Sequence, residues 1–151
     1  MVQQQFHQLV EGFCALALLE QPDAIAEGCS FSVDGIECAL IYLDYLMPDI
    51  VHCYIDFGEA PAERLTDVYL ELLKANYLHL ASGRAGFTIS PESGHVILVS
   101  TLCLANASPE VLADMLSYHA QQALEWRRHH YLDQPASAGG NTSGDAGMQF
   151  A

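Results

Sequence analysis

Residues 86–104, GFTISPESGHVILVSTLCL, contain the pattern that decides the fold of this chain. Two extended apolar segments, 87–89 and 96–104, flank the turn Pro91-Glu92-Ser93-Gly94, in which glycine supplies a left-handed residue. This pattern predicts an antiparallel hairpin. Residues 96–99 are all apolar, whereas a strand with one solvated face should alternate between apolar and polar side chains. We therefore expect both faces of this strand to need cover.

A helix is expected on each side of the hairpin. Pro61 can open the first helix, which carries apolar residues on one side, acidic residues on the other, and runs to about Tyr77. Ser108 as N-cap and Pro109 at the first helical position start the second helix, which runs to Trp126.

The N-terminal half predicts one helix and three strands. Residues 3–20 have apolar side chains at spacings of three and four, the stripe of an amphipathic helix, and Pro22 bars its continuation. Strands are expected at 29–33, at 36–43 after an Asp34-Gly35 turn, and at 50–57. The predicted order is therefore α-β-β-β-α-β-β-α, an α+β fold with a twisted five-stranded antiparallel sheet and three helices.

The domain organisation follows from a change of composition near the C-terminus. Residues 1–133 are expected to form one domain with one core. Residues 134–151 are dominated by glycine, alanine and serine, which predicts a disordered tail.

The composition is acidic and apolar at the same time. Nineteen Asp and Glu against five Lys and Arg give a net charge of −14, which repels nucleic acid and anionic lipid, so neither is an expected partner. The five cysteines are spread through apolar runs, unlike a secreted disulfide framework. Because no targeting or membrane-spanning segment is apparent either, we expect a cytoplasmic protein.

The side chains that could carry chemistry form no recognisable motif. The histidines and cysteines lack metal-ligand spacing, and the acidic residues Glu63, Asp67 and Glu71 are typical of a solvated helical face. We therefore predict no enzyme activity, no metal site and no cofactor. An enzyme that uses Cys103 with His119 is the least favoured hypothesis, and His119 is expected to be a packed or interface residue.

Strands that are apolar on both sides indicate a surface that a partner covers. Besides 96–99, the strand at 36–43 is apolar on both faces. A homodimer and an extended client could each cover one patch. The alternative is that a helix wraps to the far side of the sheet. The sequence also leaves two roles for the first helix, because its apolar stripe could fill the core or form a client groove.

Three pieces of this sequence resemble the class I type III secretion chaperones, the Tir chaperone-like family. They are Leu72-Leu73-Lys74-Ala75-Asn76-Tyr77 at the end of a helix, Ser90-Pro91-Glu92-Ser93-Gly94-His95 in the hairpin, and the strand end 102–104. The similarity spans roughly Phe6 to Trp126. The chain departs from the family pattern in its glycine-rich tail and in Cys103, where that pattern often has proline.

The resemblance implies a function and two sets of site residues. It implies a homodimeric bacterial cytosolic chaperone that binds the N-terminal region of a secreted effector in extended, unfolded form and keeps it export-competent. The secretion machinery is a further candidate partner. The implied effector-binding residues are Phe6, Leu9, Val10, Phe13, Phe31 and Val33. The implied dimer-interface residues are Leu65, Val68, Tyr69, Leu72, Ile97 and Val99. The alternative function is an adaptor of the same fold that recognises a folded partner.

Overall fold

A computed structural model describes residues 2–132 of the chain, apart from the side chain of Leu80. The predicted tail at 134–151 and the predicted domain end at 133 lie outside the described residues.

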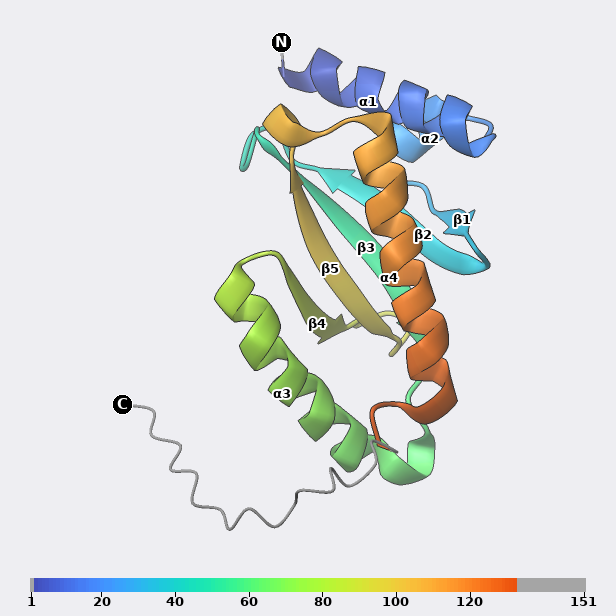
Figure 1. Ribbon diagram of the computed structural model, residues 1–151, viewed down its shortest axis with the longest axis vertical. Helices are drawn as coiled ribbons and strands as arrows, with labels where there is room; N and C mark the ends of the chain where they lie inside the picture. The colour runs from blue at the N-terminus through green and yellow to red at the C-terminus, as the bar shows by residue number, and fades with distance from the viewer. Residues whose placement is uncertain (1, 133–151) are drawn as a thin grey trace.

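The centre of the fold is one five-stranded antiparallel sheet (Figure 1). Its strands are β1 (Phe31–Val33), β2 (Ile36–Tyr42), β3 (Ile50–Gly58), β4 (Ala85–Ile89) and β5 (Val96–Cys103). The spatial order is β1-β2-β3-β5-β4, so the two hairpins meet where β3 pairs with β5. The predicted α+β class, the five strands and their antiparallel pairing are confirmed.

Three long helices pack around the sheet within residues 2–132, and they leave one of its faces open. They are α1 (Val2–Ala17), α3 (Leu65–Ser82) and α4 (Pro109–His129). The Ser108 side chain accepts a hydrogen bond from the Val111 amide at 3.1 Å, which confirms the predicted N-cap. Three short elements were not predicted: α2 (Pro22–Ala26) and the 3-10 segments η1 (Ala62–Arg64) and η2 (Leu104–Asn106). Pro22, which ends one helical pattern, thus also opens a new helix.

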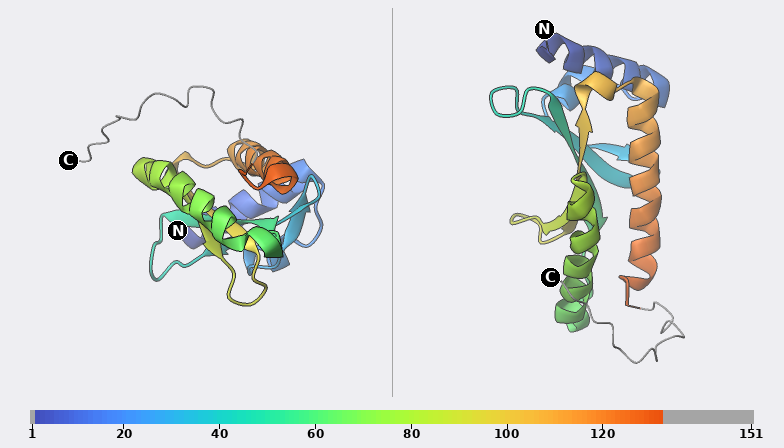
Figure 2. Two further views of the ribbon diagram at one scale, coloured as in Figure 1. Left: turned by 90° about the horizontal axis from the view of Figure 1, so that it is seen from below. Right: turned by 60° about the vertical axis from the view of Figure 1, so that its left-hand side comes forward.

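Only α4 covers a face of the sheet along its length (Figure 2). Facing α4, β3 contributes Val51, Cys53, Ile55 and Phe57, all fully buried. The helix fills this layer with Leu112, Leu116, Ala120, Ala123 and Trp126, which are equally inaccessible. The core therefore lies between α4 and one side of the sheet.

The other two long helices take up different places. α1 lies across one end of α4, and α3 packs beside the edge strand β4 (Figures 1 and 2). Within residues 2–132, no helix lies along the opposite face of the sheet (Figure 2). This arrangement favours the prediction of a partner surface over the alternative in which a helix wraps to the far side.

Candidate interaction surfaces

The stripe of α1 lies in the core of the protomer. Phe6 stacks on Tyr42 with ring centroids 4.6 Å apart, and Phe13 meets Phe31 edge-on at 5.5 Å. Gly12 allows the helix to approach closely, because a Cβ at this position would lie 2.6 Å from Cγ of Pro109 at the start of α4. α1 is therefore tightly packed against α4.

This packing buries most of the expected effector-binding residues, whose contact with a client stays a prediction. Five of the six residues are buried in the protomer, and only Val33 is partly accessible. The buried five are Phe6, Leu9, Val10, Phe13 and Phe31. Their side chains fill the core, which is one of the two roles that the sequence allows for this apolar stripe. A client that met these side chains directly would first have to displace α1.

Helix α3 is apolar on two opposite sides. Val68 and Leu72 point inward and are buried, whereas Leu70, Leu73 and Tyr77, on the opposite side of the helix, are half or more exposed. We call these three residues the outer stripe. Of the expected dimer residues, Leu65 is exposed and Tyr69, Ile97 and Val99 are partly accessible. Val68 and Leu72 are core residues of the protomer, and the expected dimer interface as a whole stays a prediction.

The amide of Asn76 fastens α3 to the edge of the sheet. Its Nδ2 donates to the Phe87 carbonyl at 3.0 Å, and its Oδ1 accepts from the Phe87 amide at 2.6 Å. Phe87 lies in β4, which has a neighbouring strand on one side only. Asn76 thus binds the edge of β4 at Phe87 as a neighbouring strand would. This contact gives a structural role to one residue of the LLKANY segment.

We expect Asn76→Ala to lower the free energy of urea-induced unfolding by about 1–3 kcal/mol, because the variant leaves two partly buried backbone groups without partners. Asn76→Asp, which keeps the acceptor and loses the donor, should fall between Asn76→Ala and the wild type. Hydrogen exchange of the Phe87 amide provides a second measurement, and it should accelerate in the alanine variant. An unfolding free energy within about 0.5 kcal/mol of wild type, with unchanged exchange, would contradict this role of Asn76.

The uncovered face of the sheet carries a shallow groove of about 350 Å³. Its floor includes Ala39, Tyr54 and Ile97 from the three central strands, and its wall is the β4–β5 turn with Ile89 and Pro91. The Tyr54 side chain is 37% exposed although it comes from the middle strand of the sheet. The solvated face of an antiparallel sheet usually carries polar side chains, so a partly exposed aromatic ring in an apolar floor marks the groove as a surface available to a partner.

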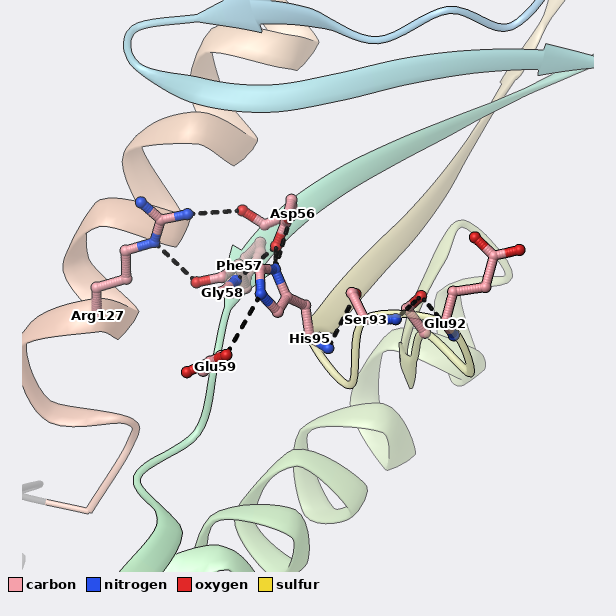
Figure 3. A network of polar contacts seen from close by, with 9 residues as sticks. Asp56, Phe57, Gly58, Glu59, Glu92, Ser93, His95 and Arg127 are labelled. Atoms are coloured by element: carbon pink, nitrogen blue, oxygen red, sulfur yellow. Dashed lines mark hydrogen bonds and ion pairs between the residues drawn. The ribbon is translucent and has the colours of Figure 1, made fainter.

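Asp56, which lines the groove, belongs to a network of polar contacts (Figure 3). The Nδ1 atom of His95 lies 2.9 Å from Oδ2 of Asp56, and its Nε2 atom lies 3.8 Å from Oε1 of Glu59. The Gly58 amide donates to Oδ1 of Asp56 at 2.8 Å. From α4, Arg127 donates to the carbonyls of Phe57 and Asp56. These bonds fix the end of β3, where the pairing with β5 shifts register, against both the hairpin and α4.

The side chains considered for enzyme chemistry lie in a different cleft. Cys103 and His119 both line a space of about 620 Å³ between α3, β5 and α4. His119 is buried, and its Nδ1 lies 2.9 Å from Oε1 of Gln122. Burial lowers the pKa of His119, while the bond to Gln122 acts in the opposite direction. His119 is thus held by a neutral amide on its own helix, in agreement with the prediction of a packed residue.

Within residues 2–132, no three His, Cys, Asp or Glu side chains gather in a way that could hold a metal ion. No helix in the same range has the length and apolar character needed to cross a membrane.

Comparison with known proteins decides the family. The model of the Tir chaperone protein (CesT) family matches residues 8–127, which include the greater part of each long helix and all five described strands. The chain belongs to this family. The resemblance to class I type III secretion chaperones that the sequence indicates is thereby confirmed, and the family to which the chain belongs is one of chaperones.

Solved structures with the same fold agree with this family assignment. The ExsC–ExsE complex contains a chain that superposes with a TM-score of 0.65 at 15% identity, covering 87% of this chain and 98% of that one. The Yersinia pestis type III secretion chaperone SycH, solved with a stable fragment of YscM2, gives a TM-score of 0.57 at 18% identity and covers 80% and 98%. The HopA1–SchA chaperone–effector complex gives 0.62 at 14% identity and covers 83% and 95%. No match was found among curated protein sequences.

Proposed function

We propose that this CesT-family protein is a bacterial cytosolic chaperone for a type III secreted effector. It would bind the N-terminal region of the effector in extended, unfolded form and keep that region soluble and ready for export. The proposal is supported by family membership and by structural neighbours that were solved as complexes of secretion chaperones with their partners.

The observation that carries the proposal is apolar surface left uncovered in a strongly acidic chain. The outer stripe of α3 and the open face of the sheet both expose large apolar side chains, although the core beneath them is complete. Ordering an unfolded segment costs several kcal/mol, and apolar contact over about 1,000 Å² or more is needed to offset this cost. The net charge of −14 would keep such a surface soluble before the client arrives.

The protein would act as a homodimer. The side chains of the outer stripe, Leu70, Leu73 and Tyr77, are half or more exposed in the protomer, and a two-fold axis would bring two copies of the stripe together. Leu65 and Tyr69 lie on the same helix and would extend the contact. Pairing through α3 would leave the open face of each sheet for the client, so one complex would present two client surfaces.

Co-purification under secretion-inducing conditions tests the function. The full-length protein, tagged and expressed in its native cell, should retain one exported protein as its main partner. Limited proteolysis of that complex should then show an extended N-terminal segment of the partner that is protected only when bound. A partner that already resists proteolysis by itself would support a folded-protein adaptor and contradict the chaperone proposal.

A further inference from the structure

The groove on the open face of the sheet combines an apolar floor with two carboxylates. Its lining includes Glu37 and Asp56, and it includes no lysine or arginine. Glu37 lies on β2 and is exposed, whereas Asp56 lies on β3 and is tied to His95. The groove therefore differs from the outer stripe of α3, in which Leu70, Leu73 and Tyr77 are all apolar or aromatic.

Strand register places the apolar and acidic residues in two parallel rows. Ala39 pairs with Tyr54, and Tyr54 pairs with Val99, which makes one row across the three strands. Two residues along the strands, Asp56 pairs with Ile97, and Glu37 is the β2 residue that continues the register opposite Asp56. Alternate residues of a strand are about 7 Å apart, so the acidic row runs about 7 Å from the apolar row.

The raised pKa of the Cys38 thiol agrees with this placement of Glu37 and Asp56. The pKa of Cys38 is raised to about 12, first by burial and then by the charges of Glu37, Asp56 and Asp34. Three carboxylates from different parts of the β1–β3 region therefore act on the same position. The Asp56 carboxylate also accepts hydrogen bonds from the Gly58 amide and lies against His95, which holds it in place. Glu37 has the more solvated carboxylate of the two lining acids.

We propose that this groove selects client segments in which a lysine or arginine lies about 7 Å from an apolar anchor, the spacing of residues i and i+2 in an extended chain. The anchor packs beside Tyr54 and Ala39, and the cation reaches Glu37 and Asp56. This inference rests on the proposed chaperone function and adds the chemistry of the segment that is recognised. An acidic neighbour would be repelled by Glu37 and Asp56, and an uncharged one would leave the Glu37 carboxylate partly desolvated without a cation, so the groove would discriminate against both.

Labelled synthetic peptides test the inference with the intact protein. The probes are extended peptides of about 20 residues that carry the same central leucines and differ only in Arg, Gln or Glu two residues from each leucine. Fluorescence anisotropy should show the Arg peptide binding about five- to tenfold more tightly than the Gln peptide, as expected for partly screened ion pairs. The Glu peptide should bind more weakly than either. Raising NaCl to about 0.5 M should remove most of the difference.

Substitutions then locate the effect. Glu37→Gln should reduce the preference for Arg over Gln, while Tyr54→Ala should weaken all three peptides together. The matched control is Glu11→Gln, which removes the same charge from an exposed site on α1. Equal binding of the Arg and Gln peptides, equal effects of Glu37→Gln and Glu11→Gln, or no binding of any peptide would each overturn the inference.

The failure of this inference can be told apart from the failure of the proposed function. If an exported protein still co-purifies with the wild type while the peptides show no charge preference, the chaperone function stands and the selectivity of the groove does not. If the Arg peptide is preferred but no exported protein is captured in the cell, the chemistry of the groove stands and the proposed client class is wrong.

Discussion

Phe13→Asp is expected to unfold the domain. The Phe13 ring is 1% exposed and packs edge-on against Phe31, in the layer where α1 meets the rest of the protein. Removing a buried phenylalanine ring costs about 3–5 kcal/mol, and a carboxylate without a partner in the same place adds several more. Because domains of this size have total stabilities of about 5–15 kcal/mol, little or no folded protein should remain. Urea titration followed by circular dichroism should show no cooperative transition.

The control for this prediction lies on the same helix. Leu16 is three residues further along α1, and its side chain is 51% exposed. Leu16→Asp makes the same change in chemistry outside the core and should alter the unfolding free energy by about 0.5 kcal/mol or less. If Phe13→Asp instead unfolds with a wild-type midpoint, α1 is not packed as the structure has it, and a client groove along α1 becomes tenable again.

Helix α1 shows what the sequence can predict and what it cannot. The spacing of Phe6, Leu9, Val10 and Phe13 identifies a helix and its apolar side correctly. The same spacing cannot say whether that side meets the core or a client, because both environments select the same residue types. The contact between Gly12 and Pro109, which settles the question, joins two segments almost a hundred residues apart.

The strands could be predicted from the sequence, whereas the row of acidic residues on the open face could not. Alternation and the Asp34-Gly35 turn predict β1 and β2 to within a few residues, and the apolar run 96–99 correctly indicates a strand. That a partner covers the second face of this strand stays a prediction. The acidic row beside the apolar row could not be predicted, because it depends on the pairing of β2, β3 and β5. One residue of slip in any pair would move Glu37 or Asp56 to the other face.

Helix α3 shows the same limit of sequence-based prediction. It has apolar residues on opposite sides, with Val68 and Leu72 on one and Leu70, Leu73 and Tyr77 on the other. Periodicity alone cannot choose between the two sides, since either could face the sheet. The choice is made by the edge of β4, to which Asn76 binds through both of its amide atoms.

Leu73→Asp is expected to convert the proposed dimer into a folded monomer. Leu73 is 66% exposed in the protomer and lies at the centre of the outer stripe, between Leu70 and Tyr77. An isologous interface contains each substituted position twice, so one change would bury two unpaired carboxylates near the axis. At a cost of about 2–3 kcal/mol per carboxylate, the dissociation constant should rise by more than about a hundredfold. Circular dichroism should remain unchanged because the side chain does not enter the core.

The matched control is Leu78→Asp. Leu78 is 72% exposed on the same helix, but it lies about a quarter turn from the outer stripe, on the side of Lys74 and Glu71. Light scattering during size-exclusion chromatography should find Leu78→Asp and the wild type at twice the protomer mass, and Leu73→Asp at the protomer mass. A wild type that is monomeric at every concentration would contradict the dimer itself. Dimers of both variants would place the contact elsewhere on the protomer.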